Sequence, residues 1–364
     1  MGKQRTRKVL ITGGAGFIGS NLAERLLGDS TAQIRIFDDL SRQGVAHNLA
    51  WLRQLEGGNR IEFVEGDVRS EAAIARAAAD VDEIYHLAAQ VAVTTSVDDP
   101  RTDFDVNVLG TLNVLEAARQ SGRRPFVLFT STNKVYGSLH GIPVQVDGTR
   151  YRARSAQFHG VTENEPLDFH SPYGCSKGAA DQYVRDYSRI YDLPTVVFRM
   201  SCIAGPRQFG TEDQGWVAHF LYSVLEGKPI TIYGDGFQVR DILHVGDLID
   251  AMQSVNDQRE HTAGQIYNLG GGPQRSISIV EMLDAIQKET GVKPILRHSQ
   301  VRPGDQPLYV SCTNKLTEHT GWVARRSCAQ TLASIHEFWS RNREMLSGPR
   351  DATVLRELVG EEVA

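Results

Sequence analysis

The sequence lacks the features of several large classes of protein. It contains no apolar run long enough for a membrane-spanning helix, which needs roughly 20 residues. Its four cysteines form no CxxC pair, so we expect neither a metal site nor a disulfide framework. The basic MGKQRTRKV leads into a strand-like VLIT without an apolar leader segment, so we expect a cytoplasmic protein.

Neither basic nor acidic residues are in large excess. The chain has 39 Lys and Arg against 44 Asp and Glu, a net charge of −5 over 364 residues. This mild acidity argues against nucleic acid as a main partner. The length predicts two domains rather than one.

Short β-branched runs alternate with helical segments over the first two thirds of the chain. The runs are VLIT (9–12), IRIF (34–37), IEFV (61–64), EIYHLA (83–88), FVLFTS (126–131) and TVVFRM (195–200). Buried parallel strands separated by helices predict an α/β fold with a doubly wound parallel Rossmann sheet. Turns become frequent after residue 200, which predicts a smaller C-terminal α/β lobe.

We therefore expect a Rossmann domain over residues 1–200, a substrate lobe over 201–345 and a tail over 346–364. The long polar segment 138–170 lies between a strand and a helix and is predicted to cover the site. Residues 240–252 are predicted to return to the first domain.

A glycine-rich turn follows the first predicted strand. In GGAGFIGSN, Gly13, Gly16 and Gly19 have the GxxGxxG spacing, with Phe17 and Ile18 between the last two. At the end of a strand and the start of a helix, this spacing lets the backbone approach a pyrophosphate. The alternative is a plain glycine-rich turn.

Acidic residues follow the next two strands. Asp38 lies about 20 residues after the glycine turn, where an acid binds the adenosine ribose diol and repels a 2′-phosphate. NAD is therefore favoured over NADP, although Arg42 leaves room for the phosphate. Asp67 and Val68 are candidate adenine contacts, and Asp67 is alternatively a turn former.

The fourth strand ends in small residues that allow a cofactor to lie close to the backbone. These candidate contacts are Leu87, Ala88, Ala89 and Gln90. We interpret His86 as a core residue. Asn107 on the following helix either holds the irregular strand end or lies on a plain helix face.

The fifth strand ends in Ser131, Thr132 and Asn133, at the edge where open α/β sheets bind ligands. Tyr173 and Lys177 lie four residues apart on a later helix, so they share a face. A phenol with a pKa near ~10 is a poor base at neutral pH, but an ammonium and a positive nicotinamide favour its ionised form. We expect Tyr173 to be the acid/base catalyst, Lys177 to tune it and bind cofactor, and Thr132 to orient the substrate.

These motifs, with QVAVTTSVDDP, STNKVYG, LDFHSPYGCSKGAADQY and FGTEDQGWV, resemble the extended short-chain dehydrogenase/reductase family of nucleotide-sugar enzymes. The likeness runs from Val9 to about Trp339 and is greatest to its CDP-paratose 2-epimerase (CDP-tyvelose epimerase) group. The resemblance implies a bound NAD, a CDP-linked 3,6-dideoxyhexose as substrate and epimerisation at C2 through a keto sugar.

The same resemblance implies nucleotide-sugar contacts at Arg240, Arg302 and Asp305, each of which is alternatively a surface ion pair. It also implies a homodimer through the helices predicted at 107–120 and 172–191. Cys202 and Met200 depart from the family pattern, since a thiol is a weak hydrogen-bond donor.

Other functions stay open on the sequence, among them other nucleotide-sugar epimerases and a net dehydrogenase of the same fold, which would need an exchangeable cofactor. A 4,6-dehydratase is disfavoured, because such enzymes carry an acid where this chain has Asn133 and Lys134. A UDP-hexose 4-epimerase uses the same hydride chemistry at another carbon. An NAD-binding regulator without catalysis is the alternative from another class, and intact Tyr173, Lys177 and Thr132 argue against it.

Overall fold

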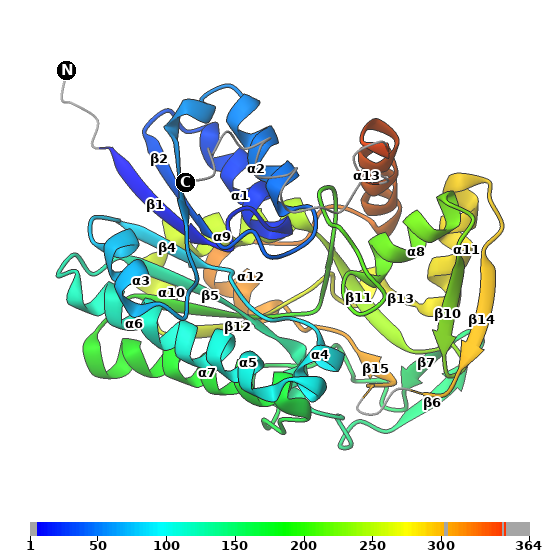
Figure 1. Ribbon diagram of the computed structural model, residues 1–364. Coiled ribbons are helices and arrows are strands. Elements are labelled where there is room, and N and C mark those ends of the chain that lie inside the picture. Colours follow the sequence, from blue (N-terminus) through cyan, green and yellow to red (C-terminus); the bar gives the residue numbers. More distant parts are fainter. Residues whose placement is uncertain (1–5, 302–304, 344–345, 347–364) are drawn as a thin grey trace.

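The computed structural model describes residues 6–301, 305–343 and Leu346. Its largest element is a seven-stranded sheet in the order β3-β2-β1-β4-β5-β8-β12, in which every neighbouring pair is parallel (Figure 1). The strands are β1 (Arg7–Thr12), β2 (Ala32–Asp38), β3 (Ile61–Glu65), β4 (Glu83–His86), β5 (Phe126–Thr132), β8 (Thr195–Met200) and β12 (Gln265–Leu269). The α/β class and the parallel sheet are confirmed.

Helices cover both faces of this sheet. One face carries α1 (Phe17–Leu27), α2 (Val45–Gln54) and α9 (Val245–Asp257), and the other carries α3 (Glu71–Ala78), α6 (Gly110–Gln120) and α7 (Ser171–Tyr191). Successive side chains of a strand point to opposite faces. Val9 and Ile11 therefore pack under the first group of helices, whereas Leu10 packs under the second.

A smaller part of the molecule has its own core. It contains α8 (Trp216–Leu225), α11 (Ile279–Thr290) and α13 (Cys328–Arg341), with strands β9 (Cys202–Ala204), β10 (Pro229–Tyr233), β11 (Val239–His244), β13 (Ser276–Ser278), β14 (Ile295–Ser299) and β15 (Leu308–Tyr309). Strand β11 pairs in parallel with β9 and β15 and antiparallel with β13, while β10 and β14 form a separate parallel pair. These mixed sheets form the smaller C-terminal lobe expected from the sequence.

The chain returns to the large sheet through α9 and β12, whereas the first residues of the predicted 240–252 belong to β11 of the smaller lobe. Helix α9 packs beside α1, where Arg25 Nη1 donates to Asp250 Oδ1 at 2.6 Å. Strand β12 then becomes an edge strand of the seven-stranded sheet. Its QIYNL sequence is short and flanked by turns, so the sequence pattern did not separate it from the strands of the second lobe.

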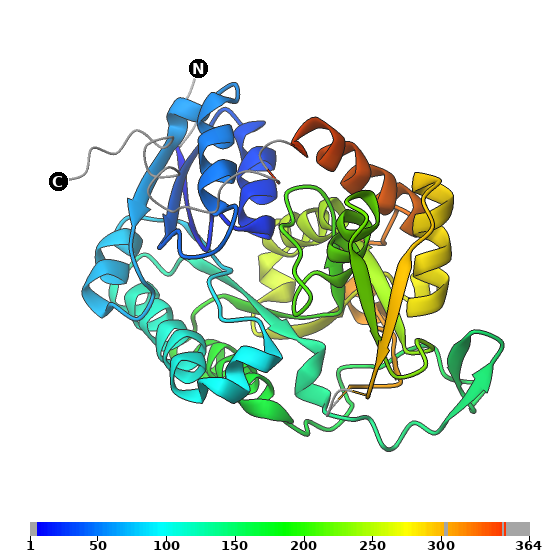
Figure 2. The same ribbon diagram turned by 45° about the vertical axis from the view of Figure 1, so that its right-hand side comes forward.

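The segment 138–170 forms a hairpin of β6 (Val144–Asp147) and β7 (Arg150–Ala153), on the outer side of the smaller lobe (Figure 2). The Tyr151 backbone N–H donates to Phe237 O at 3.0 Å, and Arg150 Nε donates to Glu281 Oε1 at 2.7 Å. None of the residues of this segment lines the cavity described below, and a covering role for the segment stays a prediction.

The predicted tail, 346–364, lies outside the described residues except for Leu346. Within the described part of the chain, no helix has the length and apolar character needed to cross a membrane. The same residues hold no cluster of three or more His, Cys, Asp or Glu arranged to bind a metal ion.

Candidate active site

A cavity of about 650 Å³ lies at the carboxyl ends of the parallel strands, where open α/β sheets bind ligands. Most of the predicted site residues line it. At its cofactor end these are Gly13, Gly16, Phe17, Ile18, Gly19, Asp38, Asp67, Val68, Leu87, Ala88, Ala89 and Gln90. At its other end they are Ser131, Thr132, Tyr173, Lys177 and Cys202.

The glycine turn is packed too tightly for side chains. Gly13 has φ +69°, and a Cβ there would lie 2.7 Å from the Ala88 backbone N. A Cβ at Gly19 would lie 2.4 Å from Gly13 O. Glycine at these two positions brings the N-terminus of α1 against the ends of β1 and β4, and unpaired N–H groups at a helix N-terminus favour phosphate oxygens.

Asp38 ends β2 and is 8% exposed. Its Oδ2 accepts from the Ala15 N–H and its Oδ1 from the Leu40 N–H, both at 3.0 Å. Burial raises the pKa of Asp38 to about 6, although these two hydrogen bonds act in the opposite direction. A buried carboxylate beside the glycine turn is the acceptor that a ribose diol requires.

Asp67 is held by its neighbour on the chain. Its Oδ2 accepts from Arg69 Nε at 2.8 Å, and its Oδ1 accepts from the Arg69 backbone N–H at 2.8 Å. These bonds to Arg69 lower the pKa of Asp67. Asp67 therefore both shapes the turn after β3 and lines the cavity.

The end of β4 is fixed by residues behind the cavity. The His86 ring lies between the hydroxyls of Thr12 (Nδ1–Oγ1 2.7 Å) and Thr111 (Nε2–Oγ1 3.0 Å), and burial lowers its pKa to about 3. His86 is a neutral core residue, as the sequence indicated. Asn107 does not line the cavity, but its amide accepts from the Gln90 N–H and donates to Gln90 O, both at 3.0 Å.

Tyr173 and Lys177 lie on α7 beside the end of β5, and both are buried. Burial raises the pKa of Tyr173 to about 12, whereas a hydrogen bond with Thr132 and the charge of Arg42 lower it. Burial also lowers the pKa of Lys177 to about 7, and the charges of Asp181 and Asp103 raise it. The Lys177 Nζ lies 4.1 Å from the centroid of the Phe129 ring.

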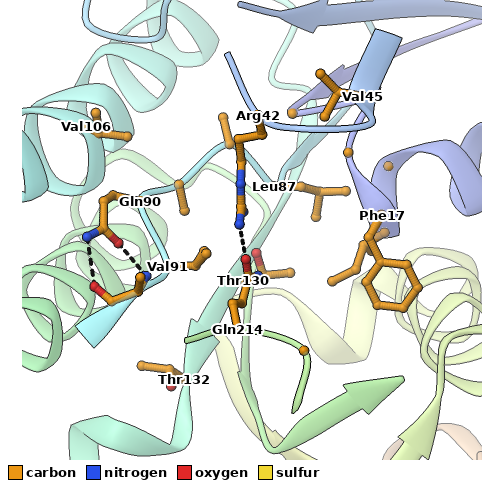
Figure 3. Close-up of a pocket in the computed structure, with 18 of the residues that line it drawn as sticks. Phe17, Arg42, Val45, Leu87, Gln90, Val91, Val106, Thr130, Thr132 and Gln214 are labelled. Carbon is orange, nitrogen blue, oxygen red and sulfur yellow. Dashed lines mark hydrogen bonds between the residues drawn. The ribbon is translucent and has the colours of Figure 1, made fainter. Parts of the chain in front are cut away.

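Arg42 lines the cavity on the loop after β2. Its side chain hydrogen-bonds Gln214 within the cavity, and Figure 3 shows this bond joining the loop after β2 to the chain before α8. Its charge acts on Tyr173, so it is not only a candidate phosphate contact. The sequence analysis did not identify Gln214, because no local pattern marks a residue that meets its partner across 172 positions.

The segment before α8 closes one side of the cavity and is fixed to the Rossmann helices. Asn21 Nδ2 of α1 donates to Pro206 O at 3.1 Å. The Phe209 ring packs against Gly44, just before α2, where a Cβ would lie 2.3 Å from the ring. Gln208 and Gln214, from this segment, line the cavity.

The far end of the cavity has a mixed lining. Its apolar part contains Met200, Ile203, Trp216 and Val217, next to Cys202, and Ser201, Gln208 and Gln214 line the same region. The Trp216 Nε1–H donates to Cys202 Sγ at 3.3 Å. The thiol is therefore occupied as an acceptor, and the indole is held against the wall.

The other predicted substrate contacts lie off this cavity. Asn133 Nδ2 donates to Gln306 Oε1 at 3.3 Å. Arg240 Nη2 donates to Asp305 Oδ1 at 2.7 Å, and Lys134 Nζ lies 3.8 Å from the same oxygen. Arg302 lies outside the described residues.

Comparisons with known proteins identify the family of this chain. The family described as GDP-mannose 4,6 dehydratase matches residues 10–335. A CDP-paratose 2-epimerase from Salmonella typhi is 42% identical over 340 residues, 92% of this chain and 99% of the relative.

Two solved structures share the fold and hold NAD. UDP-glucuronic acid 4-epimerase from Bacillus cereus, in complex with UDP-glucuronic acid and NAD, is 25% identical with a TM-score of 0.78, over 92% of this chain and 99% of that one. The dTDP-glucose 4,6-dehydratase DesIV from Streptomyces venezuelae is 30% identical with a TM-score of 0.79, over 93% and 98%. This chain therefore belongs to the extended short-chain dehydrogenase/reductase family of NAD-dependent nucleotide-sugar epimerases and dehydratases.

Proposed function

We propose that this protein is an NAD-dependent epimerase that interconverts CDP-paratose and CDP-tyvelose at C2 through a transient 2-keto sugar. The glycine turn would hold the NAD pyrophosphate, and the buried Asp38 would accept from the adenosine ribose hydroxyls. A carboxylate in that position repels a 2′-phosphate, which supports NAD over NADP. Bound NAD would accept a hydride from C2 and give it back to the opposite face of the keto sugar.

The chain's own residues move the proton. Tyr173 Oη would take the proton of the C2 hydroxyl as the carbonyl forms, and would return it when the carbonyl is reduced. Thr132, whose hydrogen bond lowers the Tyr173 pKa, would orient the same oxygen. Lys177 would bind the nicotinamide ribose, and its ammonium together with the charge of Arg42 would favour the phenolate.

The positions of the carboxylates favour epimerisation over dehydration, and this observation is the main support for the proposal. Among the described residues that line the cavity, the carboxylates are Asp38, Asp39 and Asp67, all at the cofactor end. None adjoins Thr132, where a dehydratase needs an acid and base for β-elimination. Asn133 and Lys134 follow Thr132 instead, and their side chains lie toward Gln306 and Asp305.

The apolar part of the far end supports a deoxygenated sugar. Met200, Ile203, Trp216 and Val217 offer no side-chain acceptor to a hydroxyl, and Cys202 offers only a thiol. Hexose hydroxyls that face these apolar side chains, and not Ser201, Gln208 or Gln214 of the same cavity, would stay unpaired at a cost of about 1–3 kcal/mol each. A 3,6-dideoxyhexose has fewer hydroxyls to satisfy. This supports the CDP-paratose assignment over a UDP-hexose 4-epimerase.

Arg240 and Asp305 are proposed contacts for the nucleotide diphosphate and its ribose. Arg240 is 9% exposed and its guanidinium pairs with Asp305, near Lys134. Arg240 and Lys134 together carry more positive charge than Asp305 neutralises, so a diphosphate could be bound there. The planar guanidinium of an arginine can donate two hydrogen bonds to phosphate oxygens.

We also propose a cytoplasmic homodimer. Exposed apolar side chains gather on the helices at one side of the molecule: Phe104, Leu109, Tyr183, Ile190 and Tyr191. Helices α6 and α7 lie side by side there (Figure 1). A second copy on this face would bury side chains that a monomer leaves in water. All four cysteines lie in the described part of the chain as free thiols, which suits a reducing compartment.

The test is proton NMR of the purified protein with CDP-paratose in D₂O, without added cofactor. Conversion to CDP-tyvelose without deuterium at C2 would establish hydride transfer at that carbon and a retained NAD. Deuterium at C2 would mean proton abstraction beside a ketone formed elsewhere on the ring, against the proposed mechanism. No conversion, with turnover of a UDP-hexose instead, would favour the 4-epimerase.

The matched control is Tyr173→Phe, which removes only the acid/base hydroxyl. It should keep NAD, measured by absorbance after denaturation, and lose turnover by about 10²–10⁴-fold. Turnover above about a tenth of the unchanged protein would contradict the assignment of Tyr173. An NAD-binding regulator would keep its biological effect in this variant.

A further inference from the structure

The segment before α8, residues 205–215, is held between the two lobes beside the cavity. The Arg207 guanidinium lies over the Trp51 ring of α2, and its Cζ is 5.5 Å from the centroid of the Phe338 ring of α13. Arg207 has φ +67°, a left-handed conformation that costs a non-glycine residue free energy and persists where the surroundings fix it. The start of the segment is therefore fixed by one helix from each lobe.

Phe209 gives the segment a second fixed point. Its ring packs against Gly44, where a Cβ would lie 2.3 Å from a ring carbon, and its centroid is 6.3 Å from that of Phe338. The Tyr222 hydroxyl of α8 donates to the Gln208 backbone O at 3.1 Å. Movement of the whole segment away from the cavity would therefore have to break packing with both lobes.

A tight turn after Phe209 carries Gln214. The Thr211 N–H donates to Gln214 O at 2.8 Å, and the Gln214 N–H donates to Thr211 O at 3.2 Å. Away from the cavity, the Tyr233 hydroxyl donates to Glu212 Oε1 of the same turn at 2.6 Å. The turn therefore has a defined shape, and it presents the Gln214 side chain to the cavity.

The Arg42 side chain meets Gln214 in the cavity. Arg42 Nη2 donates to Gln214 Oε1, which joins the loop after β2 to a turn of the smaller lobe. In the view of Figure 3, this bond lies between Gln90, after β4, and Phe17, at the start of α1. Both of these residues line the cofactor end of the cavity. The bond therefore stands across the space that the glycine turn and Asp38 assign to the dinucleotide.

Gln214 is the one hydrogen-bond partner of the Arg42 side chain among the residues that the structure describes. The nearby carboxylates are engaged elsewhere. Asp38 accepts from two backbone N–H groups, and Asp39 Oδ1 accepts from the Ser41 N–H at 3.0 Å. Loss of the Gln214 acceptor would therefore leave Arg42 without a hydrogen bond across the cavity.

We propose that Arg42 and Gln214 form a side-chain gate that closes the cavity over bound NAD and retains the cofactor between turnovers. The inference rests on the NAD cycle of the proposed function and deepens it, but it does not depend on which sugar is bound. Because Arg207 and Phe209 fix the segment, the gate opens by rotation of two side chains, without separation of the lobes. An epimerase reuses the same NAD in each turnover, so slow release costs it no activity.

The test is release of labelled NAD from the loaded protein into an excess of unlabelled NAD. Gln214→Met keeps the length of the side chain but removes the acceptor, and release should become about tenfold faster, because a hydrogen bond to a charged group is lost. Arg42→Met should speed release by a similar factor. The double variant should be no faster than the faster single variant, since both substitutions remove the same bond. Effects that multiply, or unchanged release in Gln214→Met, would overturn the proposal.

The affinity for NAD distinguishes a gate from a direct contact with the cofactor. The bond joins two protein groups, so its loss should speed entry and release alike. The dissociation constant of Gln214→Met, measured by calorimetry, should therefore stay within about threefold of that of the unchanged protein. A dissociation constant that rises in step with the release rate would make Gln214 a contact of NAD and would overturn the gate.

Tyr233→Phe is the matched control. It removes the hydroxyl that donates to Glu212 in the same turn, and it leaves Arg42 and Gln214 in place. Release from this variant should stay within about twofold of that from the unchanged protein, because the gate itself is not altered. If Tyr233→Phe speeds release as much as Gln214→Met, loosening of the turn would explain both results and the proposal would fail.

The same variants separate this inference from the proposed substrate. Faster release in Gln214→Met, with no conversion of CDP-paratose by the unchanged protein, would overturn the proposed substrate and support the gate. Conversion of CDP-paratose by the unchanged protein, with unchanged release in Gln214→Met, would overturn the gate alone.

Discussion

Asp38 offers a prediction in which stability and cofactor binding change in opposite directions. Burial raises its pKa to about 6 in the folded chain, against an ordinary value of 3.8. The folded state therefore holds this proton more tightly than the unfolded state does. Asp38 favours folding while it is protonated, and this contribution is lost as the pH rises from about 4 to about 6. Above that range, the difference in pKa corresponds to a cost of about 3 kcal/mol.

Asp38→Asn removes the charge but keeps only one acceptor oxygen. The carboxylate accepts from the N–H groups of both Ala15 and Leu40, so one of these bonds is lost, at about 1 kcal/mol. Without bound dinucleotide, the variant should be more stable than the unchanged protein by about 1–2 kcal/mol at pH 8. Below about pH 4, it should be less stable by about 1 kcal/mol, because the charge is absent from both proteins there.

The assay is urea unfolding of the dinucleotide-free proteins across this pH range, with NAD binding measured by calorimetry at pH 8. The same substitution should weaken NAD binding by roughly 10–100-fold, because the ribose hydroxyls lose a charged acceptor. A variant that is destabilised by the same amount at every pH would refute the reasoning, since the carboxylate would then carry no burial cost.

Three further substitutions test other parts of the site. Phe209→Ala removes the ring packed on Gly44 and should speed NAD release about tenfold, as measured by exchange with labelled NAD. Unchanged release would show that the segment before α8 does not retain the cofactor. Trp216→Phe removes the N–H donated to Cys202 and should raise KM for the sugar nucleotide several-fold at unchanged NAD content; a lower kcat at constant KM would contradict a binding role. Ile190→Glu places a charge on the exposed apolar face and should convert a dimer to monomers in light scattering, whereas an intact dimer would place the interface elsewhere.

The sequence by itself determined the sheet and the chemical groups. Six of the seven strands match β-branched runs, and all of these except the edge strand β3 are largely buried, because a parallel sheet covered by helices needs apolar residues on each side. Glycines between β1 and α1 mark a turn where no Cβ fits, and the four-residue spacing of Tyr173 and Lys177 places both on one helix face. These features are local, so they can be read along the chain.

Only the tertiary structure determined the hydrogen-bond partners and the pKa values of those groups. The bonds from Arg42 to Gln214 and from Arg240 to Asp305 join residues far apart in sequence, and neither has a local pattern. The hairpin of β6 and β7 packs on the smaller lobe, because its ion pair is with Glu281 and a backbone bond is with Phe237, and no local pattern predicts these partners. Burial and long-range charge set the pKa values of the site, and both arise only when distant segments of the chain pack together.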